Sequence, residues 1–136
     1  MRNRMAREII VTPAAPPPGG AYSQVVAAGS VVATAGQVGS DPITGTLATG
    51  IEAQTRQALA NVAAVLAAAG CSWRDVIKTT CFLSDIGNFA AFNGAYASVI
   101  PEPWPARSTI GVALAGELLV EIEALAVRPG DERWDR

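Results

Sequence analysis

One long helix constrains the fold of this chain most, because its single apolar stripe needs a sheet to cover it. Residues 51–69 read IEAQTRQALANVAAVLAAA, with apolar positions at helical spacing. The stripe contains Ile51, Thr55, Leu59, Val62 and Leu66. Thr49 and Glu52 have the spacing of a capping box, and Gly70 is placed to end the helix. The segment predicts an amphipathic helix with one buried face.

The segments around this helix have the β-branched composition of strands. The predicted strands are residues 7–13, a hairpin over 23–39 that turns at AGS, and residues 76–85, 107–114 and 118–127. A second helix is predicted over 87–100, with an apolar face formed by Phe89, Phe92, Tyr96 and Val99. This order predicts the α+β class, with a mixed sheet and both helices packed on one of its faces.

The second face of the predicted sheet is also apolar, and the chain has no third helix to cover it. The mean hydropathy of +0.28 is high for a small soluble monomer. The longest apolar stretch, VAAVLAAAG, is far shorter than the ~20 residues of a spanning helix. APPPGG ends the N-terminal apolar run before a signal peptide could form. We therefore expect a cytoplasmic, self-associating protein with no membrane association.

Composition narrows the possible chemistry. The net charge is −2 and no basic run occurs, so no nucleic-acid partner is expected. The chain has no histidine, which excludes Ser-His and Cys-His nucleophile pairs and predicts no metal site. Cys71 and Cys81 lack the spacing of a disulfide framework, and Cys81 is expected to pack as a small hydrophobe in a strand. Carboxylates, arginine, tyrosine, hydroxyls and backbone amides remain for any reaction.

Three charged positions on predicted strands stand out. Arg107, in PARSTI, is either a solvated strand end or a fork aimed at an anion. Glu121 and Glu123, in VEIEALAV, share one strand face, and they either sit on a wet edge or need a partner. The strands of Arg107 and Glu121 are joined by a short turn, so we expect them to pair antiparallel. That pairing keeps the two residues apart within one chain, and they could meet across a subunit contact.

Several motifs together resemble one known family. These are GAYSQ, TAGQVGSDPITG, QTRQALANVAAVLAAAG, DVIKTTCFLSDIGNFAAFNGAY, PARSTI and VEIEALAV. In this order, from residue 13 to 127, they are similar to the Rid (YjgF) family of reactive-intermediate deaminases. The resemblance implies a chorismate-mutase-like fold assembled as a homotrimer, with sites in the clefts between subunits. It also implies hydrolysis of enamines and imines such as 2-aminoacrylate to a 2-keto acid and ammonia, as in a 2-iminobutanoate/2-iminopropanoate deaminase.

The resemblance also implies roles for particular residues. Arg107 matches the arginine that grips the substrate carboxylate, and Glu121 matches the acid that positions the attacking water. The other substrate-binding positions correspond to Tyr22, Gly36, Asn93 and Thr109. Thr109 stands where the archetypes often carry cysteine, and Ala35 stands where they often carry serine, so these two positions bear on the substrate range. Imine hydrolysis needs only a positioned water, a proton acceptor and a proton donor for the leaving amine, so no cofactor is expected.

Simpler structural roles stay open for three of these residues. Tyr22 could cap its loop, Asn93 could be a polar residue on a helix face, and Gly36 could serve close strand packing. We expect a single domain over residues 6–128, with frayed tails at 1–5 and 129–136.

Alternative functions also stay open. One is a catabolic deaminase specific to one pathway, which Ala35 and Thr109 would permit. The others are a ribonuclease and a non-enzymatic ligand-binding trimer. The acidic balance and the lack of histidine count against RNA cleavage.

Overall fold

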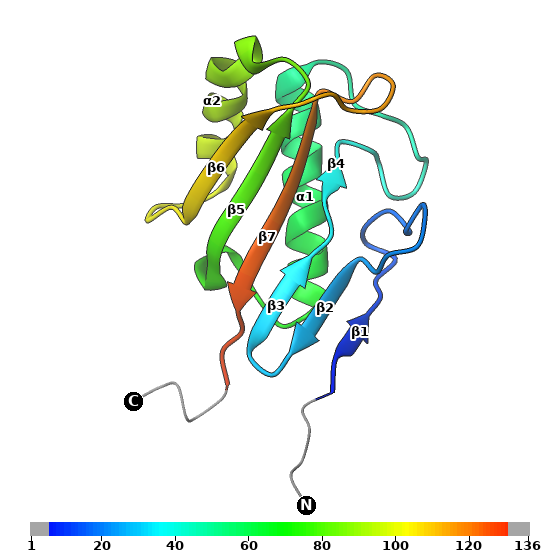
Figure 1. Ribbon diagram of the computed structural model, residues 1–136, viewed down its shortest axis with the longest axis vertical. Helices are drawn as coiled ribbons and strands as arrows, with labels where there is room; N and C mark the ends of the chain where they lie inside the picture. Colours follow the sequence, from blue (N-terminus) through cyan, green and yellow to red (C-terminus); the bar gives the residue numbers. More distant parts are fainter. Residues whose placement is uncertain (1–5, 131–136) are drawn as a thin grey trace, which may run out of the picture.

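The chain folds into one mixed sheet with two helices on a single face, as the sequence predicted (Figure 1). The computed structural model describes residues 6–130. Its strands are β1 (Glu8–Ile10), β2 (Val25–Ala28), β3 (Val31–Thr34), β4 (Gln37–Val38), β5 (Val76–Leu83), β6 (Ala106–Gly111) and β7 (Val120–Val127). Its helices are α1 (Ile51–Ala68) and α2 (Phe89–Val99), with 3-10 turns at Trp73–Asp75 and Ile86–Asn88. Of the predicted tails at 1–5 and 129–136, residues 1–5 and 131–136 lie outside the described residues.

The strand order shows where the predicted pairing was wrong. The sheet runs β1-β2-β3-β7-β5-β6, and β4 pairs with β7 beyond the end of β3. β5 lies between β6 and β7, so these two strands do not pair, although the chain connects them directly. β5 and β6 are parallel because α2 carries the chain back across the helical face between them. The eight-residue strand β5 therefore bonds along both of its edges, to β6 on one side and to β7 on the other.

Helix α1 buries the predicted stripe against the sheet. Thr55, Leu59, Val62 and Leu66 are all fully buried. Gly70 ends the helix as expected, with a φ of +82° that suits glycine. The predicted capping box was wrong: the helix begins after Gly50, and no side chain caps its first turn. No helix within residues 6–130 is long and apolar enough to cross a membrane.

The side chains of strand β7 alternate between the two faces of the sheet. Its buried positions, which pack toward the helices, are Val120, Ile122, Ala124 and Ala126. Glu121, Glu123, Leu125 and Val127 lie on the opposite face, as the alternation predicted. At the end of this face, Leu125 and Val127 are 37% and 38% exposed in the single chain. Together with Ile9 and Val31, also exposed, they form an uncovered apolar sheet face.

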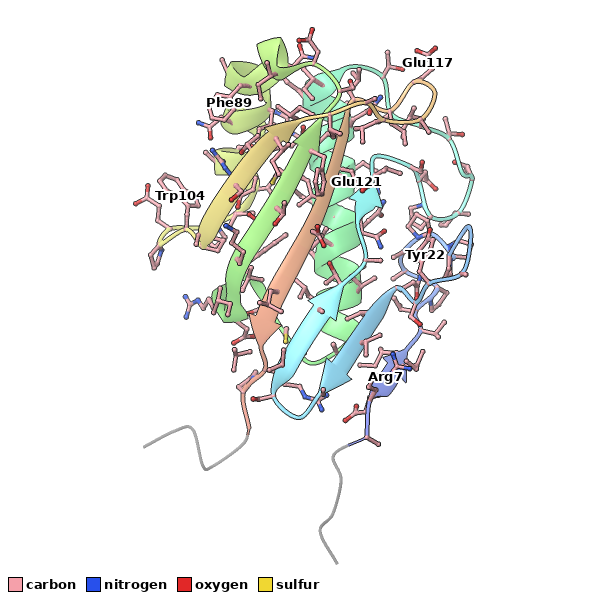
Figure 2. The ribbon with its side chains drawn as sticks, in the orientation of Figure 1. Arg7, Tyr22, Phe89, Trp104, Glu117 and Glu121 are labelled. Carbon is pink, nitrogen blue, oxygen red and sulfur yellow. The ribbon has the colours of Figure 1, made fainter. Side chains whose placement is uncertain are left out.

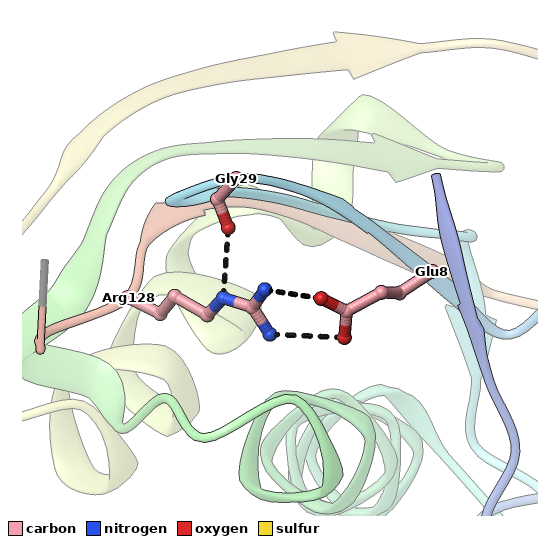
Figure 3. A network of polar contacts seen from close by, with 3 residues as sticks. All are labelled: Glu8, Gly29 and Arg128. Carbon is pink, nitrogen blue, oxygen red and sulfur yellow. Dashed lines mark hydrogen bonds and ion pairs between the residues drawn. The ribbon is translucent and has the colours of Figure 1, made fainter. Parts of the chain in front are cut away.

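A cluster around Arg128 ties the first strand to the end of the last one (Figure 3). The guanidinium pairs with Glu8 at 2.7 Å and donates through Nε to the carbonyl of Gly29 at 2.8 Å. This ion pair holds the pKa of the Glu8 carboxyl below its ordinary value. The cluster therefore fixes β1 against the β2–β3 turn, at the C-terminal limit of the predicted domain.

Candidate active site

Arg107 lies on the edge strand β6 and is directed toward the helices. In the parallel register it is opposite Thr79 of β5, which is buried under α2. Its guanidinium carbon is 5.6 Å from the ring centroid of Phe89, 5.5 Å from that of Phe92 and 4.7 Å from that of Tyr96. All three rings belong to α2. Arg107 is therefore a half-buried cation held over an aromatic surface, and the interpretation as a solvated strand end does not fit.

A cavity of about 300 Å³ opens beside this arginine. Its lining consists of Asn93, Tyr96, Ala97, Trp104, Pro105 and Arg107. The structure thus brings together two residues that the sequence placed in one site, Arg107 and Asn93. The cavity offers a guanidinium and an amide beside aromatic walls, which suits a small ligand with a carboxylate and an apolar part.

Two residues of this cavity were missed as site residues. Trp104 is anchored by a hydrogen bond of 2.9 Å from its indole Nε1 to the carbonyl of Ile100. The signal for it was its place in WPAR, three residues before Arg107. Tyr96 was predicted only as part of the apolar face of a helix. The signal there was its hydroxyl, since a buried tyrosine needs a polar partner.

Glu121 lies on the open face of the sheet, away from the helices (Figure 2). It is opposite Phe82 of β5 and Val38 of β4. Burial raises the pKa of its carboxyl above the usual 4.5, and the negative charge of Glu123 raises it further. A carboxylate with a raised pKa is a better proton acceptor near neutral pH, which is the property that a general base needs.

Gly36 is in contact with Glu121. A Cβ atom at Gly36 would lie 2.8 Å from the carboxyl carbon of Glu121, closer than real atoms approach. The glycine therefore makes room for this carboxylate, which is more specific than the strand packing considered from the sequence.

Thr109 shares the Arg107 face of β6, where it is opposite buried Cys81. Cys81 packs in β5 as predicted, and burial raises the pKa of its thiol to about 11.

Tyr22 lies apart from the other predicted site residues. It is 53% exposed, and its hydroxyl accepts a hydrogen bond of 2.9 Å from the amide of Gly19. Figure 2 shows Tyr22 and Trp104 near opposite edges of the sheet. The loop that holds Tyr22 is anchored by buried Gln24, whose side-chain amide bonds to Thr12 and to the carbonyls of Ala15 and Pro16. Within one chain, Tyr22 closes its own loop.

One chain therefore presents the predicted site in two parts. The first part is Arg107 with Asn93 on the helical side of the edge strand, and the second is Glu121 with Gly36 on the open face. Arg107 is opposite Thr79 of β5, and Thr79 is opposite Ala124 of β7. Arg107 is therefore level with a residue three positions from Glu121, and it lies on the opposite face of the sheet from Glu121. Within residues 6–130, no three His, Cys, Asp or Glu side chains gather into a group that could hold a metal ion.

Comparison with known proteins gives consistent matches along nearly the whole chain. Residues 12–128 match the endoribonuclease L-PSP family. A 2-iminobutanoate/2-iminopropanoate deaminase of Salmonella typhimurium is 45% identical over 123 residues, covering 88% of this chain and 96% of that protein. A RutC family protein of Synechocystis is 46% identical and covers 92% of this chain and 99% of its own length. The solved structure of Escherichia coli TdcF with bound serine has a TM-score of 0.86 at 40% identity, covering 90% of this chain and 99% of that one.

Proposed function

Since the chain belongs to the endoribonuclease L-PSP family, the family of the YjgF and Rid proteins, we propose that it hydrolyses reactive 2-imino acids and their enamine tautomers. The products are a 2-keto acid and ammonia, with 2-aminoacrylate as the simplest substrate. The observation that supports this most is Arg107, a cation free of any ion pair within residues 6–130 and lining a small cavity. The names of relatives more than 40% identical support the same reaction.

The proposed reaction assigns one task to each part of the site. The Arg107 fork binds the substrate carboxylate by two parallel hydrogen bonds and so orients the imine carbon. Glu121 accepts a proton from a water molecule as the water oxygen attacks that carbon. Glu121 passes this proton to the imine nitrogen, which gives a carbinolamine. The carbinol hydroxyl then transfers its proton through Glu121 to the nitrogen, the C–N bond breaks, ammonia leaves and the carbinol oxygen becomes the keto oxygen. Asn93, Thr109 and Tyr22 are proposed to line the substrate cleft.

The two parts of the site require a second copy of the chain. Arg107 and Glu121 lie on different faces of one sheet, so one chain alone cannot hold a small substrate between them. The uncovered apolar face around Leu125 and Val127 offers a surface for self-association. We propose a homotrimer whose open sheet faces turn inward, with Arg107 of one copy facing Glu121 of the next.

A 2-aminoacrylate challenge tests this function. A serine dehydratase generates the enamine in the assay, and pyruvate release is followed with and without the protein, at constant dehydratase activity. We expect the protein to accelerate pyruvate release above the spontaneous rate, and we expect Glu121→Gln not to do so. Release at the spontaneous rate with folded wild-type protein would refute the proposal. A panel of larger 2-imino acids then tests the alternative of a deaminase specific to one pathway.

A further inference from the structure

Within residues 6–130, the guanidinium of Arg107 contacts aromatic rings and forms no ion pair with a carboxylate. Its contacts with Phe89, Phe92 and Tyr96 have centroid distances between 4.7 and 5.6 Å. Within the part of the chain that the structure describes, the ion pairs are Arg56–Glu52 and Arg128–Glu8, and neither includes Arg107. The position of this cation therefore depends on cation–π contacts.

Tyr96 supplies the nearest of these rings, and it is fixed from two sides. Its hydroxyl forms a hydrogen bond of 2.7 Å with the hydroxyl of Thr79, and both residues are buried. Its ring packs against that of Phe92, with the two centroids 5.7 Å apart. Thr79 is the residue of β5 directly opposite Arg107 in the parallel register. The hydrogen bond thus fastens the ring to the pair of strands that carries the arginine.

We propose that Tyr96, fastened by Thr79, is a positioning residue for Arg107. A guanidinium held by the face of a ring keeps its N–H donors for another partner, whereas a structural carboxylate would occupy the fork. The hydrogen bond to Thr79 fixes the distance between the Tyr96 ring and the guanidinium. This inference rests on the proposed function, because the substrate carboxylate is the group that the free N–H donors of Arg107 would bind.

Three variants test the inference, with pyruvate as the carboxylate probe. Tyr96→Leu removes the ring, Tyr96→Phe keeps the ring and removes its bond to Thr79, and Val65→Ala removes buried volume from α1, a helix that supplies none of the three rings at Arg107. For Tyr96→Leu we expect a pyruvate dissociation constant about 10-fold higher, because one partly buried cation–π contact is lost. For Tyr96→Phe we expect it to be about 3-fold higher, because the contact remains but the ring is less firmly held. KM for 2-aminoacrylate should rise more than kcat falls. Val65→Ala should lower the melting temperature without changing either binding or KM.

Side-chain NMR of Arg107 separates this inference from the proposed function. Ring currents should shift its side-chain protons upfield in the wild type and in Tyr96→Phe, and clearly less in Tyr96→Leu, where only the rings of Phe89 and Phe92 remain, with Arg107→Lys used for assignment. Wild-type pyruvate affinity and KM in folded Tyr96→Leu would overturn the positioning role, even with the deaminase confirmed. Wild-type pyruvate affinity and KM in Tyr96→Phe would refute the proposed role of the hydrogen bond to Thr79. If the wild type neither binds pyruvate nor hydrolyses 2-aminoacrylate, the proposed function fails. Independently of that result, Arg107 resonances without an upfield shift in the wild type would refute the positioning role of Tyr96.

Discussion

Replacing Arg107 by lysine keeps the positive charge of the cavity and removes the planar fork. Lysine can still approach the rings of Phe89, Phe92 and Tyr96, because an ammonium also makes cation–π contacts. It offers a point charge where the guanidinium offers two parallel donors to a carboxylate. The variant therefore isolates the geometry of the fork from its charge.

The expected size of the effect follows from how small the substrate is. 2-Aminoacrylate has few handles besides its carboxylate, so a loosened carboxylate also displaces the reacting carbon from the water. A misplacement of about 1 Å can cost ~10²-fold in rate, which corresponds to about 2.7 kcal/mol of transition-state stabilisation. A solvated arginine with an exposed ionic partner would contribute only ~0–1 kcal/mol. The two interpretations of Arg107 thus differ by more than tenfold in the measured rate.

The assay compares kcat/KM for 2-aminoacrylate in the wild type and in Arg107→Lys, with circular dichroism and light scattering as controls for fold and assembly. We expect a folded variant with the wild-type oligomeric state, a kcat/KM lower by about 10²-fold or more, and a matching loss of pyruvate affinity. Wild-type turnover by Arg107→Lys would remove Arg107 from the site and refute the mechanism.

Three further perturbations test the rest of the account. Glu121→Gln should lose ~10²–10⁴-fold in turnover, and near-normal turnover of this variant would make Glu121 structural. Because the pKa of Glu121 is raised, the wild-type base should become protonated already above pH 4.5, and kcat/KM should fall as the pH is lowered through that range. Gly36→Ala should displace the Glu121 carboxylate and lower turnover about 10²-fold in a folded protein, whereas an unchanged rate would show that the carboxylate moves freely. Cys81, buried with a thiol pKa of about 11, should resist alkylation by iodoacetamide at neutral pH until the protein unfolds, and rapid labelling measured by mass spectrometry would contradict its burial.

The parts of the fold that local periodicity determines could be predicted from the sequence. The β2–β3 hairpin follows from two β-branched runs around Gly29, and α1 follows from its apolar stripe. The neighbours of β7 could not be predicted, because that choice depends on contacts between segments far apart in the chain. A short connection suggested β6 as its partner, but β5 pairs with both strands. The two-residue strand β4 is too short to show a period at all.

The candidate site was predictable only in part for the same reason. The sequence indicated Arg107 and Asn93, and the structure lines one cavity with both. It indicated Gly36 and Glu121, and the structure places them in contact. It could not show that Tyr96 lies under Arg107, because the apolar stripe of α2 explains a tyrosine there equally well. That contact arises only when α2 folds back over the parallel pair β5–β6.

The central claim is that Arg107 of one copy and Glu121 of the next form one catalytic site, and mixing of inactive variants tests it most directly. Arg107→Lys and Glu121→Gln chains are combined in equal amounts, dissociated, reassembled and assayed with 2-aminoacrylate. In random mixed trimers about a quarter of the interfaces join an intact Arg107 to an intact Glu121, so about a quarter of wild-type activity should return. If activity stays at the level of the separate variants although mass spectrometry shows mixed oligomers, the site does not form between copies, and the account is contradicted.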